Sequence, residues 1–138
     1  MNSPRNVIAI DRVPVSSLVG YRRIATDSVE LNVTTPWESL SVKVPARLTI
    51  SDKIEDGVRL YTAQLVFRLC QETPGDLSRL AFRCKTADGK QVLIGSDKRP
   101  YPVARFSLAR PDNVTDSQLV EVTVSYTSAA PIPYIQYI

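Results

Sequence analysis

Histidine is absent from this chain of 138 residues. It is the commonest general base in enzymes and the commonest metal ligand in proteins. A Ser-His-Asp or Cys-His catalytic set is therefore excluded, and the two cysteines cannot form the usual zinc site without histidine. We expect no metal, no cofactor and no enzymatic activity.

Glycine is also scarce, and the five glycines are scattered through the chain. Their spacing excludes a phosphate-binding P-loop and a dinucleotide-binding fingerprint. The carboxylate pairs Glu55-Asp56 and Asp112/Asp116 lie in turn-like linkers, so solvated turn residues are the simplest interpretation. A glycosidase pair stays open, because its two carboxylates are brought together by the fold rather than by the sequence.

Long apolar runs are missing as well. No run approaches the roughly 18–20 residues of a membrane span. Asp11 and Arg12 interrupt the first apolar stretch, which excludes the apolar region of a signal peptide, so we expect the chain to stay in the cytosol. In that compartment Cys70 and Cys84 are expected to be reduced thiols. A disulfide stays open, because the two cysteines end and begin successive predicted strands.

The composition is that of one soluble globular domain, with 43% apolar residues, 22% charged residues and a net charge of +3. A nucleic-acid-binding protein usually carries a denser basic cluster. We interpret the basic candidates as a solvated face or a protein contact, and single-strand binding by an OB-like barrel is the alternative. These candidates are Arg22, Arg23, Lys98, Arg99, Arg105 and Arg110.

Short β-rich runs alternate with turn-rich linkers along most of the chain. In residues 119–128, the apolar positions 120, 122, 124 and 126 share one face, which is typical of a strand with one face in the core. Residues 59–70 alternate in the same way, and further strands are predicted over residues 27–35 and 40–54. With about seven strands and at most one short helix, we predict an all-β domain, either an antiparallel β-sandwich or a partly closed β-barrel.

Turn and breaker residues divide these strands. Asp88-Gly89 predicts a hairpin with a type I′ turn, and Asp56-Gly57 is a second turn signal. Pro45 lies inside a β-rich stretch, which indicates an edge strand or a bulge between two short strands. Residues 72–80 are predicted to form either a short helix or a loop.

The two ends differ from the middle of the chain. Prolines and Gly20 divide residues 1–20, which indicates an arm with one short strand. The tail, residues 129–138, is apolar and aromatic, so it docks either on its own domain as a last strand or on a neighbouring subunit. Because the strands from residue 29 to residue 127 do not obviously need this tail, we expect a chain without residues 131–138 to fold.

An arm at one end and an apolar tail at the other suit a protein that assembles. The lone Trp37 is interpreted first as a core or rim anchor and second as a partner contact. Tyr101 lies between two prolines, which hold its ring in a fixed place. The predicted assembly contacts are Trp37, Lys98, Arg99, Tyr101, Ile132, Tyr134, Ile135, Tyr137 and Ile138.

The run Leu93–Val103, LIGSDKRPYPV, is followed by a predicted β-hairpin that ends in Val120–Tyr126. This pattern, in the last third of the chain, resembles small all-β virion structural proteins of tailed bacteriophages and prophages. The resemblance implies a role in the tail, baseplate or head-to-tail connector of a virion that is assembled in the host cytoplasm. Further copies of the chain and other virion proteins would be its partners, and no catalytic residues are implied. A single-stranded nucleic-acid-binding barrel and a carbohydrate- or protein-binding β-sandwich stay as alternatives.

Overall fold

The computed structural model describes residues 3–40, 42–69, 79–96, 101–109 and 119–137. In these residues the chain forms strands, turns and one 3-10 turn, η1 (Val15–Ser17), and no α-helix. The strands are β1 (Ser3–Pro14), β2 (Arg22–Ala25), β3 (Ser28–Leu31), β4 (Glu38–Ser39), β5 (Val42–Glu55), β6 (Val58–Leu69), β7 (Leu80–Thr86), β8 (Gln91–Ile94), β9 (Val103–Ala109), β10 (Leu119–Ser128) and β11 (Tyr134–Tyr137).

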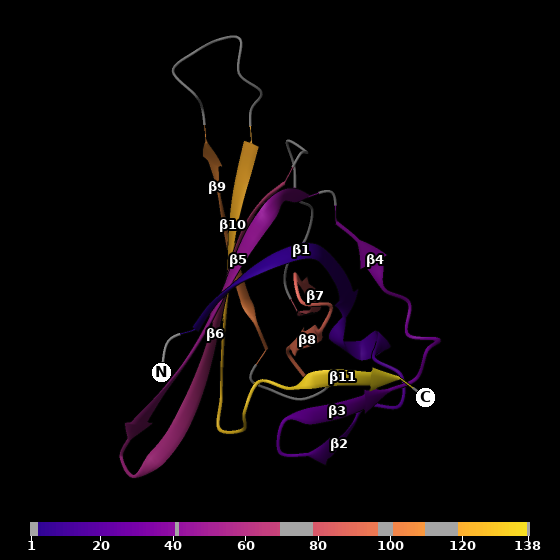
Figure 1. Cartoon of the computed structure of the whole chain (residues 1–138), viewed down its shortest axis with the longest axis vertical. Coiled ribbons are helices and arrows are strands. Elements are labelled where there is room, and N and C mark those ends of the chain that lie inside the picture. Colours follow the sequence, from indigo (N-terminus) through magenta and orange to yellow (C-terminus); the bar gives the residue numbers. More distant parts are fainter. Residues whose placement is uncertain (1–2, 41, 70–78, 97–100, 110–118, 138) are drawn as a thin grey trace.

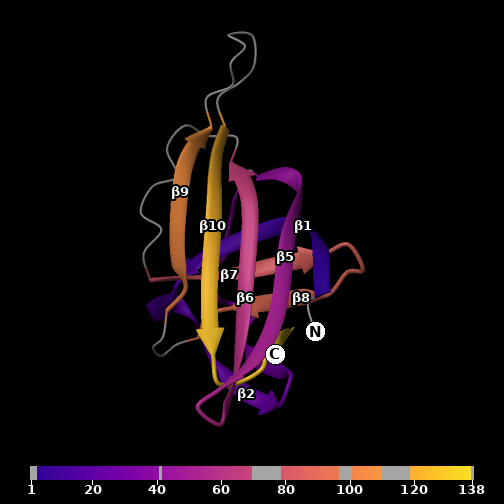
Figure 2. The ribbon, with the colours of Figure 1, turned by 90° about the vertical axis from the view of Figure 1, so that its left-hand side faces the viewer.

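All eleven strands belong to one sheet, in the order β2-β3-β11-β8-β7-β1-β5-β6-β10-β9, with β4 beside β1. Neighbouring strands run antiparallel, except β11 and β3, which run parallel. We refer to β5, β6, β10 and β9 as the long half of the sheet, and to β7, β8, β11, β3 and β2 as the short half. In Figure 2 the long half lies in front, and β7 and β8 run across behind it. Figure 1 shows the two halves from the side.

Strand β1 joins the two halves. Its first residues, Ser3 to Val7, pair with β5, and its remaining residues, Val7 to Pro14, pair with β7. The register with β7 shifts between Val7 and Ala9, which marks an irregularity of the β-bulge kind. Because a bulge bends its strand, β1 can leave one half of the sheet and enter the other at this point.

The main core lies between the two halves. Strands β6 and β10 direct alternate apolar side chains toward it, and β1, β7 and β8 supply the opposing side chains. Its buried members are Val7, Ile10, Ala46, Leu48, Ala63, Leu65, Phe67, Leu69, Leu80, Phe82, Cys84, Val92, Ile94, Val122, Val124, Tyr126 and Ile132.

The short half is buried on its other face as well. Ala81 and Leu93 belong to a second cluster, whose further buried members are Val13, Val15 and Val29. Strands that are buried on both faces carry continuous apolar runs instead of alternation. The run Val92-Leu93-Ile94 therefore serves both clusters. Partly buried side chains cover the second cluster: Leu18, Tyr21, Trp37, Tyr101 and Ile135.

The all-β prediction is confirmed, but the sheet has eleven strands and not about seven. The strands that the sequence did not indicate are β2 and β4. The four side chains of β2 are all exposed, and β4 has only two residues. Neither strand can therefore show the alternation of apolar and polar residues on which strand prediction depends.

The N-terminal residues differ from the predicted arm. Residues 3–14 form one strand of twelve residues in the interior of the sheet. Val7, Ile10 and Val13 on this strand are fully buried or nearly so. Pro4 and Pro14 are compatible with the strand because β1 has a partner on only one side at each of these positions.

Both predicted turns connect hairpins, but the type predicted for Asp88-Gly89 differs from the one observed. At Asp56-Gly57 both residues have positive φ, 52° and 79°, so the two-residue turn between β5 and β6 is the one with I′ character. In the β7–β8 hairpin only Gly89 has positive φ, 89°, and Asp88 does not. Thr86 N–H donates to Lys90 O at 2.9 Å, which leaves a three-residue loop, Ala87–Gly89. The hairpin prediction is confirmed and the type I′ assignment is wrong.

Of the two alternatives at Pro45, the edge strand is wrong, and an irregularity of the β-bulge kind is present within one continuous strand. The register between β5 and β6 shifts between Lys43 and Arg47, while β5 itself lies inside the sheet between β1 and β6. A short helix or a loop was predicted over residues 72–80. Residues 72–78 lie outside the described residues, and Leu80 begins β7.

The C-terminal tail docks on its own domain, which is one of the two alternatives from the sequence. Tyr134–Tyr137 forms β11, which lies between β3 and β8. Tyr134 N–H donates to Asp27 O at 2.8 Å, and Leu93 N–H donates to Pro133 O at 3.0 Å. Among the described strands, β3 pairs with β2 and β11 alone, so β11 attaches the β2–β3 hairpin to the rest of the sheet.

Candidate functional site

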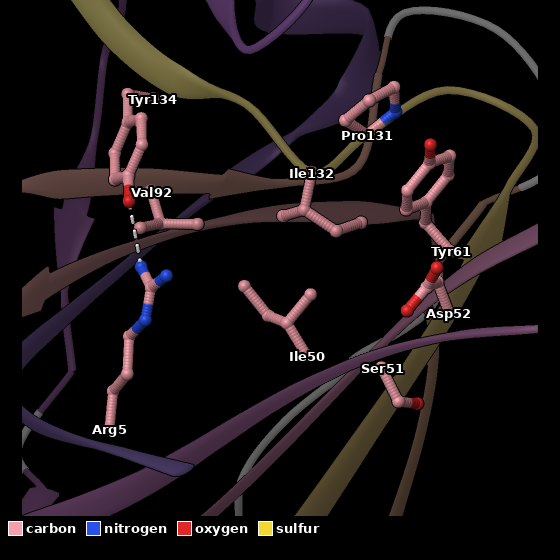
Figure 3. A pocket seen from close by; sticks show the side chains of 9 residues that line it. All are labelled: Arg5, Ile50, Ser51, Asp52, Tyr61, Val92, Pro131, Ile132 and Tyr134. Carbon is pink, nitrogen blue, oxygen red and sulfur yellow. Dashed lines mark hydrogen bonds between the residues drawn. The ribbon is translucent and has the colours of Figure 1, made fainter. Parts of the chain in front are cut away.

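A pocket of about 290 Å³ lies where the two halves of the sheet separate near the tail. Strands β1, β5 and β6 contribute residues from one side, and β8 and the tail contribute residues from the other. Figure 3 shows apolar side chains in its middle and polar side chains toward its two ends. The lining residues are Arg5, Ile50, Ser51, Asp52, Tyr61, Val92, Pro131, Ile132 and Tyr134.

One end of this pocket is positively charged. Arg5 Nη1 donates a hydrogen bond of 3.0 Å to Tyr134 Oη, and the guanidinium carbon lies 5.8 Å from the centre of the same ring. Lys90 Nζ lies 5.1 Å from that ring centre. At the other end, the carboxylate of Asp52 is ion-paired with Arg59 at 3.2 Å. Arg5 and Lys90 therefore place two positive charges beside Tyr134.

A second polar cluster surrounds Arg83 on β7. Its guanidinium donates from Nε to Asp11 Oδ2 at 2.8 Å and from Nη1 to Tyr137 Oη at 2.6 Å. Nη2 forms an ion pair with the same Oδ2 at 2.7 Å. The Trp37 ring lies 4.9 Å from the guanidinium carbon. Ser39 Oγ donates to the other carboxylate oxygen of Asp11 at 2.8 Å. These contacts join β1, β4, β7 and β11.

The pKa of Arg83 reflects this environment. Burial alone would lower the pKa, but the hydrogen bonds to Tyr137 and Asp11, together with the charge of Asp11, raise it above its ordinary value. The guanidinium therefore stays charged and its donors are engaged by Asp11 and Tyr137. We interpret this cluster as a structural link within the short half of the sheet.

An open groove of about 990 Å³ lies beside η1 and the start of β7. Arg12 and Glu38, which line it, form an ion pair of 3.1 Å. Arg79, another lining residue, has positive φ, 53°. The remaining lining residues are Pro14, Val15, Ser16, Leu80 and Tyr101.

Six of the nine predicted assembly contacts lie in the described part of the chain, and they are packed in or beside the short half of the sheet. Ile132 is buried in the main core, and Tyr134 packs against it. Trp37, Tyr101 and Ile135 pack against the second cluster, and Tyr137 contacts Arg83. The indole Nε1 of Trp37 is buried and has no hydrogen-bond partner in the described part of the chain. Lys98, Arg99 and Ile138 lie outside the described residues.

The basic candidates are not gathered in one place by the described strands. Arg22 forms an ion pair with Glu30 at 3.3 Å, and Arg23 donates to Thr26 O at 2.7 Å and to Pro131 O at 3.2 Å. These arginines lie on β2, whereas Arg105 lies on β9 at the opposite end of the strand order. Lys98, Arg99 and Arg110 lie outside the described residues.

Cys84 is a free thiol, fully buried in the main core. Burial raises its pKa far above the ordinary thiol value, which keeps it protonated and unreactive. Cys70 lies outside the described residues, so the prediction of two reduced thiols stays a prediction.

Comparisons with known proteins give no family for this chain. No family model, curated protein or solved structure matches it. Within the described ranges, no group of three or more His, Cys, Asp or Glu residues is placed to hold a metal ion. None of the helical structure in these ranges is long and apolar enough to cross a membrane.

The sequence did not indicate the pocket beside Tyr134. Arg5 lies in the residues for which the sequence indicates an arm, and Tyr61 lies in a predicted strand of alternating residues. Their proximity depends on the pairing of β1 with β5 and on the docking of β11. No local spacing in the sequence carries that information.

Proposed function

We propose that this chain is a non-enzymatic structural subunit of a phage or phage-like particle, in the tail, baseplate or head-to-tail connector. It would be assembled in the host cytoplasm from further copies of itself and other virion proteins. The observation that supports this proposal best is that the sheet has two different free edges. Within the described residues, β9 and β2 each have a neighbour on one side only.

A free strand edge presents unpaired N–H and C=O groups, which can pair with a strand of another chain. Strand β9 has seven residues, pairs with β10 along its whole length, and exposes 54% of Val103. Strand β2 is shorter, and all four of its residues are exposed. Because the two edges differ, pairing of one with the other is heterologous, and heterologous contacts generate rings or open helical stacks.

Within this proposal the two halves of the sheet act as the layers of an antiparallel β-sandwich. The shared core supports this description, because the long and short halves direct apolar side chains toward each other. A sandwich of this kind keeps its free edges, whereas a closed barrel would remove them.

The test is to place a lysine at the free edge of β9 by substitution. We expect Val103→Lys to reduce self-association or incorporation into particles, because edge lysines oppose strand pairing. Val58→Lys is the matched control, since Val58 has a similar exposed fraction, 51%, and lies on β6, an interior strand. Light scattering and native mass spectrometry would report the assembly state. Equal assembly of the two variants would contradict the role of this edge.

The nucleic-acid alternative makes a different prediction. Binding to single-stranded DNA through Arg22, Arg23, Lys98 and Arg99 would weaken steeply with salt, because phosphate contacts release counterions. We expect no such binding in moderate salt. A salt-sensitive micromolar affinity in an anisotropy titration would favour the barrel alternative over the structural subunit.

A further inference from the structure

The hydrogen bond between Arg5 and Tyr134 leaves donors at the positively charged end of the pocket. Tyr134 Oη accepts from Arg5 at 3.0 Å, so the phenol hydrogen remains available to donate. Arg5 has five N–H donors, of which this bond uses one. Within the described part of the chain, this is the only hydrogen bond that either side chain makes. The pair can therefore donate to one further acceptor group.

The middle of the pocket is apolar. Ile50, Val92 and Ile132 lie between Arg5 and the opposite end, as Figure 3 shows. Val92 and Ile132 are buried members of the main core, so their positions are fixed by packing. A volume of about 290 Å³ is close to the lower limit for small-molecule pockets. A ligand of this size would place an apolar body of a few carbon atoms against these side chains.

The charges favour an anion. Arg5 lines the pocket, and Lys90 Nζ lies 5.1 Å from the centre of the Tyr134 ring. The carboxylate of Asp52 lies at the other end of the pocket and forms an ion pair of 3.2 Å with Arg59. A carboxylate matches the planar fork of a guanidinium, and hydrogen bonds between charged groups are stronger than neutral ones. An uncharged apolar ligand would leave these donors unpaired.

We propose that this pocket binds a small organic carboxylate with an apolar body. The carboxylate accepts hydrogen bonds from Arg5 and from the Tyr134 hydroxyl, and the body lies against Ile50, Val92 and Ile132. This inference concerns a ligand of the single chain, so it does not depend on the free strand edges or on assembly.

The test is a titration of the full chain with sodium hexanoate, followed by the chemical shifts of backbone amides. We expect saturable shifts around Ile50, Val92 and Ile132 with hexanoate and at least about tenfold weaker binding of 1-hexanol, which has the same body without the charge. Methyl glucoside tests the carbohydrate alternative in the same way. Preferential binding of the sugar, or equal binding of hexanoate and hexanol, would overturn the proposal.

Variants separate the carboxylate contact from general effects on the pocket. Arg5→Gln should weaken hexanoate binding about tenfold or more, and Tyr134→Phe about three-fold, because each removes donors to the anion. Arg68→Gln is the matched control, since Arg68 lies on β6 in an exposed ion pair with Glu121. Tyr134→Phe keeps the packed ring, so it tests the contact even where Arg5→Gln impairs folding. Unchanged affinity in both test variants, or no saturable binding to the unaltered chain, would overturn the assignment.

Discussion

The two halves of the sheet are built by different kinds of strand pairing. In the long half, β5 pairs with β6 through a two-residue turn and β9 pairs with β10, and these two pairs are joined by β6 and β10, which are distant in sequence. In the short half, β11 pairs with β3, and Tyr134 faces Ser28 across more than a hundred residues of chain. The long half thus needs one non-local pairing, between β6 and β10, whereas the short half also needs the tail to return to residues 28–31.

This difference predicts where stability is most easily lost. Closing a long loop costs conformational entropy that a local hairpin does not require. The short half offsets that cost with two buried faces and with the cluster around Arg83. Changes in the tail should therefore disturb the molecule more than changes of similar size in the long half.

The largest expected effect follows from deleting Pro131–Ile138. The deletion removes β11, detaches β3 from β8, and takes the buried Ile132 out of the main core. We expect loss of the cooperative thermal transition measured by circular dichroism, which reverses the expectation drawn from the sequence. Gln136→Ala is the control, because Gln136 is the exposed residue of β11 and its substitution leaves the strand in place. A truncated chain with an unaltered transition would show that the short half does not need its tail.

The sequence predicted the long half well for a physical reason. Strand β6 has one face in the core, so Ala63, Leu65 and Phe67 are buried while Gln64 and Arg68 are exposed. Alternation of this kind is visible without knowing the partner strand. The same reasoning succeeded for β10, where Val122 and Val124 are buried.

The short half could not be predicted in the same way. The prolines of β1 suggested an arm, because the sequence does not tell which positions of a strand have a partner on one side only. The tail left two alternatives, since an apolar segment is buried equally well in its own domain or in a partner. Predicting the pocket would have required both the place of β1 in the sheet and the docking of the tail, because the pocket combines Arg5 of β1 with Tyr134 of β11.

A second prediction tests whether the two halves unfold together. Phe82 of β7 and Phe67 of β6 are both buried in the main core, with exposed fractions of 0% and 2%. We expect Phe82→Ala and Phe67→Ala each to lower the free energy of unfolding by about 3–5 kcal/mol in one urea transition. Two separate transitions, with each variant affecting only one of them, would show that the halves are independent cooperative units.

A third prediction compares an ion pair from each half. Arg83→Met leaves Asp11, whose side chain is only 14% exposed, without its partner, and it removes the hydrogen bond to Tyr137. We expect a loss of about 2 kcal/mol, because a partly buried carboxylate is costly to leave unpaired. Arg68→Met breaks the exposed pair with Glu121 and should cost less than about 1 kcal/mol. Equal losses in urea unfolding would mean that the Arg83 cluster adds nothing specific to the short half.

The smallest expected effect concerns the turns of the two halves. In the β7–β8 loop, Asp88 accepts hydrogen bonds from Thr86 Oγ1 and from Lys90 N–H, whereas Asp56 occupies the two-residue turn of the long half. The hydrogen bond from Thr86 is the main reason that the pKa of Asp88 is lowered, and desolvation acts in the opposite direction. A lowered pKa in the folded chain means that the carboxylate contributes stability above the ordinary aspartate pKa, and that this contribution is lost as the pH falls through the folded value.

Asp88→Asn should therefore be slightly less stable than the unaltered chain near neutral pH, and the difference should shrink as the pH falls below about 4. Urea unfolding of the variant and of the unaltered chain at a series of pH values would measure this difference in stability. The effects of all other titrating groups are shared by the two proteins and cancel in the difference. Asp56→Asn is the matched control, because asparagine tolerates positive φ and this turn needs it. The control shows how much of a change in stability comes from replacing a turn aspartate by asparagine. A difference at Asp88 that stays constant from neutral to acidic pH would mean that its charge does not support the turn, and that the two hairpins are held by backbone geometry alone.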